Sequence, residues 1–205
     1  MSKKRRPQRV EKPIRIVGGK FGGRKLHFYG APGTKPMKQR VREAIFNLLG
    51  PAVQGKHVLD LFAGTGAMGL EALSRGAGRA TLVEQHFPTV ELIRRNVADL
   101  GVEDLCDVVA ADTFIWVRRR LFDLASHPEA WLVFCSPPYA FYVDRKDEML
   151  WLIEAMVRES PDGSLFVVEA DRRFDFSLVQ KQNTWDVRKY PPAVVGIHRK
   201  NLQTS

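Results

Sequence analysis

The sequence predicts an α/β fold with a doubly wound, mostly parallel seven-stranded sheet and a small basic extension, a β-hairpin and a helix, at the N-terminus. The first observation behind this prediction is that five short apolar segments alternate with helix-like segments between residues 57 and 169. Such alternation is typical of parallel strands joined by right-handed crossover helices. The second is that two β-like runs, residues 184–190 and 193–199, flank Pro191 and Pro192 and predict a closing antiparallel hairpin.

The stretch HVLDLFAGTGAMGLEALSRGA, residues 57–77, starts this alternation. Its apolar beginning, which contains Asp60, predicts a buried parallel strand. The glycine-rich residues 63–66 predict a turn, and residues 67–75 predict the crossover helix. Glycines let backbone N–H groups approach a ligand closely, and a helix N-terminus adds partial positive charge. This stretch is therefore a candidate ligand-binding turn.

The other elements are expected in chain order from their apolar spacing. Strands are expected at residues 79–84, 106–111, 131–135 and 164–169. Helices are expected at residues 88–100, 113–125 and 148–158. An apolar helical stripe also follows residue 38 and stops at Gly50 and Pro51.

In such a sheet, ligands bind beyond the carboxyl ends of the strands. The residues expected there are three acids and one short segment: Asp60, Glu84, Asp112 and Ser136-Pro137-Pro138-Tyr139. For a ligand that contains adenosine, Glu84 is placed to accept hydrogen bonds from the two ribose hydroxyls, and Asp112 from the adenine amino group. For Asp112 the alternative is that it caps the following helix.

Two ligand classes fit the glycine turn. Gly64, Gly66 and Gly69 match the G-x-G-x-x-G fingerprint of dinucleotide binding, which supports a nicotinamide-dependent oxidoreductase. In that motif, however, the first glycine directly follows the strand, whereas here Asp60 lies four residues before Gly64. An acid beside a glycine turn favours a ligand that is cationic there, such as the sulfonium and ammonium of S-adenosylmethionine. A turn that only packs strand on helix remains a third interpretation.

The charge of the chain is concentrated near its beginning. The net charge is +9, but residues 1–56 carry 15 Lys and Arg against two acids, and the remainder is slightly acidic. This asymmetry predicts a polyanion-binding extension on a small-molecule domain. We expect a disordered basic tail over residues 1–12, a polyanion-binding extension over residues 13–54 and a small-molecule domain over residues 55–200.

The extension contains six candidate contacts to the phosphates of a polyanion. The segment IRIVGGKFGGRKLHFYG predicts a glycine-rich hairpin or loop with exposed bases, and further bases lie near the start of the first helix. The candidates are Lys20, Arg24, Lys25, Lys38, Arg40 and Arg42. A solvated basic surface is the alternative.

The sequence gives no support for a membrane protein, a secreted protein or a metalloprotein. No apolar run approaches the ~20 residues of a membrane span, and the beginning of the chain lacks the apolar core of a signal peptide. Cys106 and Cys135 have no metal-site spacing, and the five histidines form no ligand pattern. We expect a cytoplasmic monomer with no metal and no membrane partner.

At this point the chain resembles a known family, the RsmD-type methyltransferases. The matching pieces are IRIVGGKFGGRKL, QRVREAIFNLL, LDLFAGTGAMGLEALSRGA, LVE and PPY. The resemblance implies a Rossmann-like class I methyltransferase fold. It also implies transfer of a methyl group from S-adenosylmethionine to the exocyclic N2 amine of a guanine in small-subunit (16S) ribosomal RNA, free or in a 30S assembly particle. S-adenosylhomocysteine is the expected product.

The resemblance also implies where the site lies. The expected cofactor-binding residues are Asp60, Phe62, Ala63, Gly64, Thr65, Gly66, Glu84 and Asp112. The expected catalytic residues are Ser136, Pro137, Pro138 and Tyr139. By the same resemblance, residues 13–54 are an RNA-binding extension, the six basic candidates above are its RNA contacts, and residues 55–200 are the S-adenosylmethionine-dependent methyltransferase domain.

One departure from the family concerns the mechanism. The family has Asp or Asn before Pro-Pro-Tyr or Pro-Pro-Phe, and this chain has Ser136. A carboxylate or amide there accepts amino hydrogens and aims the nitrogen lone pair, and a serine loses about 1–2 kcal/mol of that interaction. Three outcomes stay open: a slow enzyme, a changed substrate, or a protein that binds cofactor and RNA with little activity. A slow enzyme predicts that Ser136→Asp raises the rate.

Overall fold

The computed structural model describes residues 14–28, 37–180 and 184–201. The predicted disordered tail, residues 1–12, lies outside the described residues. Seven strands in this part of the chain form one sheet. They are β1 (His57–Asp60), β2 (Arg79–Glu84), β3 (Cys106–Ala110), β4 (Trp131–Cys135), β5 (Leu165–Asp171), β6 (Trp185–Tyr190) and β7 (Ala193–Arg199).

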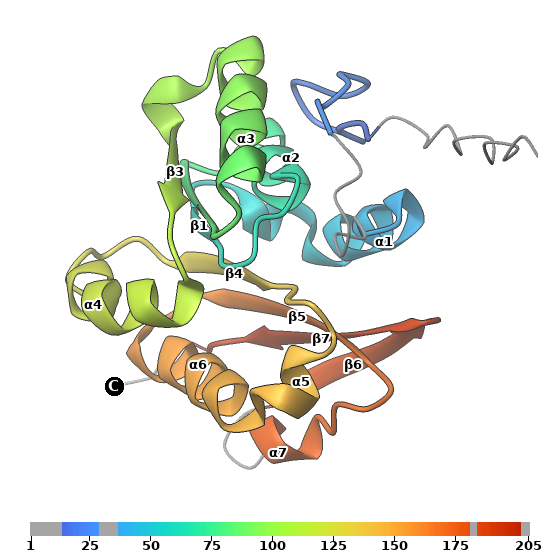
Figure 1. Ribbon diagram of the computed structural model, residues 1–205, viewed down its shortest axis with the longest axis vertical. Helices are drawn as coiled ribbons and strands as arrows, with labels where there is room; N and C mark the ends of the chain where they lie inside the picture. The colour runs from blue at the N-terminus through green and yellow to red at the C-terminus, as the bar shows by residue number, and fades with distance from the viewer. Residues whose placement is uncertain (1–13, 29–36, 181–183, 202–205) are drawn as a thin grey trace, which may run out of the picture.

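Helices cover both faces of this sheet. They are α1 (Gln39–Leu49), α2 (Ala67–Ser74), α3 (Phe87–Leu100), α4 (Thr113–Ala125), α5 (Phe141–Asp144), α6 (Lys146–Glu159) and α7 (Ser177–Gln180), with short 3-10 helices η1 (Gly50–Val53) and η2 (Glu103–Leu105). Figure 1 shows α1, α2 and α3 above the sheet and α4 to α7 below it. The architecture is therefore a three-layer doubly wound fold.

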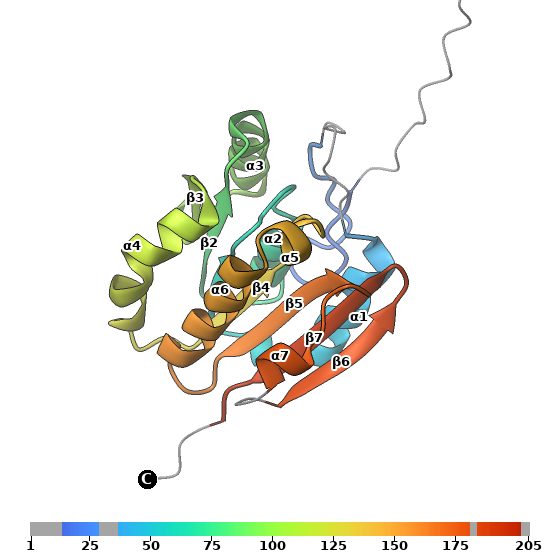
Figure 2. The ribbon, with the colours of Figure 1, turned by 60° about the horizontal axis from the view of Figure 1, so that its bottom comes forward.

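The strand order is β3-β2-β1-β4-β5-β7-β6. Strands β1 to β5 pair in parallel, whereas β7 is antiparallel to both of its neighbours, β5 and β6. Figure 2 shows the β6–β7 hairpin at one edge of the sheet with α1 behind it. The predicted fold class and the predicted C-terminal hairpin are confirmed.

Each face of the sheet has its own apolar core. In β4, Leu132 and Phe134 pack with residues of α1, α2 and α3, whereas Trp131, Val133 and Cys135 pack with residues of α4 and α6. Successive side chains of a strand point to opposite faces, so a strand buried on both faces is apolar throughout. This alternation also decides which side chains beyond the strand end share a face.

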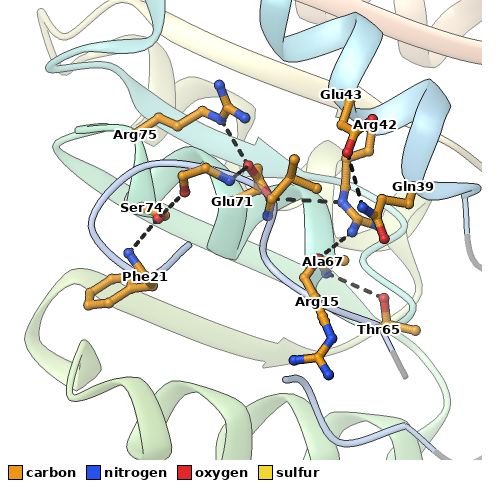
Figure 3. A network of polar contacts seen from close by, with 12 residues as sticks. Arg15, Phe21, Gln39, Arg42, Glu43, Thr65, Ala67, Glu71, Ser74 and Arg75 are labelled. Carbon is orange, nitrogen blue, oxygen red and sulfur yellow. Dashed lines mark hydrogen bonds and ion pairs between the residues drawn. The ribbon is translucent and has the colours of Figure 1, made fainter. Parts of the chain in front are cut away.

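The N-terminal segment, residues 14–28, is part of this packed structure. It forms a loop closed by one isolated bridge between Arg15 and Lys25, and Ile16 and Leu26 are buried in the core that contains α1 and α2. Figure 3 shows the polar contacts that hold the segment against α2, centred on Glu71. The division between an extension and a catalytic domain stays a prediction, and the two parts share a core.

The largest differences from the predicted elements involve short helices. Helices α5 and α7 have four residues each, too few for a helical period to show in the sequence. Strand β1 ends at Asp60, although the apolar run continues to Phe62. Within the described ranges, every helix is too short or too polar to span a bilayer.

Candidate active site

A cavity of about 760 Å³ opens beyond the carboxyl ends of the strands. Its wall includes Glu84 at the end of β2, Asp112 after β3, and the segment Ser136–Phe141 after β4. Glu169 of β5, the beginning of α1 and the turn of the β6–β7 hairpin also contribute to the wall. The cavity therefore lies at the predicted edge of the sheet, and the predicted residues Glu84, Asp112 and Ser136–Tyr139 meet in its wall.

The glycine turn lies behind this wall and is fastened to it by Glu84. Gly64 and Gly66 have φ angles of 53° and 73°, in the left-handed region that favours glycine. The N–H of Gly64 donates to Glu84 Oε2 at 2.9 Å, and the N–H of His86 donates to Oε1 at 2.8 Å. Each carboxylate oxygen keeps a further acceptor site, so Glu84 can still bind a hydroxyl.

The other turn residues expected in the cofactor site do not line the cavity. Phe62 lines it, whereas Ala63, Gly64, Thr65 and Gly66 are not among its wall residues. They form the support that positions Phe62 and Glu84.

The structure corrects the expected position of Asp60. Its side chain is fully covered and is absent from the cavity wall, so it does not face a cationic ligand there. Instead, the N–H of Gly69 in α2 donates to Asp60 Oδ2 at 3.1 Å. Burial raises the pKa of Asp60 to about 7, against the opposing effect of that hydrogen bond. Asp60 therefore ties the helix to the strand beneath it.

Asp112 does what the alternative interpretation predicts, and it also faces the cavity. Its Oδ1 accepts the N–H groups of Phe114 at 2.9 Å and Ile115 at 3.1 Å, so it caps α4. Its Oδ2 lies 3.5 Å from Nη1 of Arg145. Its place in the wall leaves acceptor capacity for a ligand.

Three aromatic rings form the apolar part of the wall. The ring centroids of Phe62, Phe114 and Phe141 lie 5.9–6.2 Å apart, and the Arg145 guanidinium lies 3.9 Å from the Phe114 centroid. Flat apolar faces beside hydrogen-bond acceptors suit a heteroaromatic ring joined to a sugar. The carboxylate acceptors, the aromatic faces and the cavity thus fit the nucleoside half of S-adenosylmethionine.

The Ser136-Pro137-Pro138-Tyr139 segment lies against β5. The Tyr139 hydroxyl donates to Glu169 Oε1 at 2.8 Å. The Ser136 hydroxyl is buried close to the same carboxylate and favours its charged form, without reaching full hydrogen-bond geometry. Burial raises the pKa of Glu169 despite both hydroxyls.

Glu169 is a site residue that the sequence prediction missed. Two signals mark it: it is an acid in the apolar run SLFVVEA, with Val168 and Ala170 buried beside it, and it ends the strand expected at residues 164–169, as Glu84 ends its own strand. A lone acid in a buried strand must be neutralised or solvated by something, which marks it as a candidate functional residue.

Five of the six candidate RNA contacts are exposed: Lys20, Arg24, Lys25, Lys38 and Arg40. Lys38 also lines the cavity, at the beginning of α1. Arg24 is partly engaged, because its Nη2 donates to the carbonyl of Asp99 at 2.7 Å.

Arg42 was predicted to contact RNA, and that prediction is wrong. Its side chain is 2% exposed and donates to the Arg15 carbonyl, and its Nε lies 3.9 Å from Glu71 Oε2. The spacing of Arg42, Ile45, Phe46 and Leu49 places the arginine on the buried face of α1, which a helical-wheel count could have shown. Arg42 therefore has a structural role.

Known proteins resemble this chain in sequence and in fold. The family model described as "Conserved hypothetical protein 95" matches residues 14–191. "Ribosomal RNA small subunit methyltransferase D" of Escherichia coli (strain K12) is 48% identical over 87 residues, which are 42% of this chain and 44% of that protein. The aligned region thus spans less than half of that relative.

Two longer matches cover most of the chain. "Putative rRNA methyltransferase YlbH" of Bacillus subtilis (strain 168) is 31% identical over 79% of this chain and 85% of its own length. The solved structure of "Putative methyltransferase yhhF from Escherichia coli" has 29% identity and a TM-score of 0.73, covering 94% of this chain and all of the other. With this fold, this strand-end cavity and a family match over residues 14–191, the chain belongs to the Conserved hypothetical protein 95 family, the RsmD-type methyltransferases.

Proposed function

We propose that this protein transfers a methyl group from S-adenosylmethionine to the N2 amine of a guanine in small-subunit ribosomal RNA. The observation that carries the proposal is the meeting, in one cavity, of Glu84 and Asp112 with the Ser136–Tyr139 segment. Glu84 and Asp112 suit a nucleoside cofactor, and the Ser136–Tyr139 segment suits an exocyclic amine. The family relationship, with relatives named as ribosomal RNA methyltransferases, supports the same reaction.

In this proposal, separate groups of residues bind the cofactor, exclude water and position the acceptor amine. S-adenosylmethionine supplies an electrophilic methyl group when it is bound. Glu84 and Asp112 orient its ribose and adenine, and the aromatic wall of Phe62, Phe114 and Phe141 excludes water from them. The Pro137 carbonyl and its neighbours hold the amine so that its lone pair points at the methyl group. Catalysis of this kind is mainly positioning.

The RNA is held by the exposed bases in this proposal. Lys20 and Lys25 lie on the N-terminal segment, and Lys38 lies on the cavity wall at the beginning of α1. Phosphate contacts from such residues position a nucleic acid without specifying its sequence. A base turned out of its stack can then enter the cavity. We further propose that the protein is a cytoplasmic monomer that acts on ribosomal RNA or on a 30S assembly particle.

The rival proposal is an RNA-binding assembly protein that has kept the fold and lost the activity. Its support is Ser136, which stands where the family has Asp or Asn. The experiment that separates the two is transfer of labelled methyl from S-adenosylmethionine to small ribosomal subunits lacking the modification. Protein-free small-subunit RNA and large subunits serve as comparisons. Incorporation into small subunits or their RNA, and not into large subunits, supports the proposal. Absence of incorporation, with S-adenosylmethionine bound at micromolar affinity, supports the rival.

A further inference from the structure

We propose that Glu169, and not residue 136, provides the carboxylate that receives an amino hydrogen of the acceptor guanine. This inference rests on the proposed function and assigns a catalytic residue within it. It explains how a chain with Ser136 in place of the family's Asp or Asn retains a charged acceptor in the site.

The sheet places Glu169 beside Ser136. Strands β4 and β5 pair in parallel with Cys135 opposite Val168, so the next residue along each strand is Ser136 on one and Glu169 on the other. In β5, Leu165 and Val167 pack in the core above the sheet, and Glu169 has the same parity. In β4, Leu132 and Phe134 pack in that core, and Ser136 continues their side. The two side chains therefore share a face at adjacent positions.

The carboxylate is held in a fixed position. Glu169 is 9% exposed, its Oε1 accepts the Tyr139 hydroxyl at 2.8 Å, and its own carbonyl accepts the Tyr142 hydroxyl at 2.8 Å. Strand pairing with β7 on its other side, where Glu169 is opposite Val195, prevents the backbone from moving. A carboxylate has about four acceptor positions, so the bond from Tyr139 leaves room for a donor from the substrate.

The other acids in the cavity wall have different partners. Glu84 holds the glycine turn through both oxygens, and Asp112 caps α4 and faces Arg145. Glu169 instead lies with Ser136 and Tyr139, in the segment expected to contact the base. Its position is therefore the one suited to the acceptor amine.

In the proposed step, Glu169 receives the proton that the amine loses. The amine nitrogen forms a bond to the methyl carbon, and the sulfur–methyl bond breaks and leaves its electron pair on sulfur. One N–H bond of the amine breaks, and Glu169 takes that proton before releasing it to solvent. Burial raises the pKa of Glu169, which makes it a better proton acceptor than an exposed glutamate.

The test uses four proteins in single-turnover methyl transfer to small subunits lacking the modification: wild type, Glu169→Gln, Ser136→Asp and the double variant. We expect Glu169→Gln to slow transfer by at least roughly 10- to 30-fold, since a charged hydrogen bond becomes a neutral one and an amide cannot take the proton. S-adenosylmethionine affinity should stay within about twofold. The double variant should regain most of the rate because its new carboxylate at position 136 returns the charge. Ser136→Asp alone should lower the rate, since it puts two carboxylates side by side.

A pH profile separates a catalytic role from a structural one. Protonation of Glu169 should reduce the wild-type rate as the pH falls, and Glu169→Gln should lose that dependence. The Tyr139 hydroxyl lowers the pKa of Glu169, so Tyr139→Phe should move the midpoint of the profile to higher pH. Glu154→Gln, an exposed change of the same kind on α6, is the control for fold and charge.

The outcomes distinguish this inference from the proposed function. An active wild type with an equally active Glu169→Gln variant overturns the inference and leaves the function standing. A slow Glu169→Gln variant that Ser136→Asp does not restore, with an unchanged pH profile, also overturns it. A wild type that methylates no small-subunit RNA overturns the proposed function and the inference together.

Discussion

Replacing Glu71 with glutamine tests how the N-terminal segment is held on the fold. Glu71 lies in α2, is 0% exposed, and accepts the N–H groups of Val17 at 2.6 Å and Gly18 at 2.8 Å. Arg75 Nε donates to it at 2.9 Å, and Arg42 lies on its other side (Figure 3). One carboxylate thus joins two backbone donors and two arginines.

The magnitude of the Glu71→Gln effect follows from these contacts. Removing one charge from a buried ion pair costs about 3–5 kcal/mol, because Arg42 is 2% exposed and would keep its charge without a partner. A glutamine also places an NH₂ group against a backbone N–H, which leaves a buried donor without an acceptor. We expect the free energy of unfolding to fall by about 3–5 kcal/mol, a large share of the ~5–15 kcal/mol of a typical domain.

The assay is urea unfolding combined with amide hydrogen exchange at Val17 and Gly18. Both amides should lose protection in Glu71→Gln, whereas Glu154→Gln, on the exposed side of α6, should stay within about 0.5 kcal/mol of wild type. A Glu71→Gln protein within about 1 kcal/mol of wild type, or one in which both amides stay protected, would refute this account of the docking.

Three further predictions concern other parts of the structure. Burial raises the pKa of Asp60 from 3.8 to about 7, so the free energy of unfolding should fall as the pH rises through that interval. The decrease should be on the order of 2 kcal/mol between pH 5 and 8, and urea unfolding of Asp60→Asn should not show it. Gly69→Ala should lower the unfolding free energy by about 1–3 kcal/mol, since the new Cβ would lie 2.1 Å from Cδ2 of the fully buried Leu82, and an unchanged denaturation midpoint would contradict this. The double variant Lys20→Ala, Lys25→Ala should bind RNA more weakly and lower the slope of log affinity against log salt concentration by about 1–2, with S-adenosylmethionine affinity unchanged. An unaltered slope would exclude both lysines from the RNA contact.

Much of the fold could be predicted because its strands are short, apolar and regularly separated by helices. Strand β2 and helix α4 have the expected bounds, and the carboxyl ends of the strands do meet at one cavity. Glu84 and Asp112 lie at that edge because each stands at or just after the carboxyl end of a parallel strand. Local pattern was sufficient for these features because each depends on a single βα unit.

The features that could not be predicted depend on contacts between distant parts of the chain. The spacing of α1 places Arg42 on the buried face, but it gives no sign of its partner Glu71, which is 29 positions later and lies next to it in the folded protein. The strand-end position of Glu169 was readable from the sequence, but its pairing beside Ser136 depends on the register of β4 and β5, which no motif encodes. Asp60 is hidden because Gly69 lets α2 approach the strand closely.

The measurement that tests the central claim most directly is nucleoside mass spectrometry of small-subunit RNA after incubation with the protein and labelled S-adenosylmethionine. We predict labelled N2-methylguanosine in RNA from subunits that lack the modification, and no label in RNA that already carries it. Label in a different nucleoside would show that the cavity accepts another amine or ring position. No labelled nucleoside, with the cofactor bound, would contradict the assignment of a methyltransferase activity to this chain.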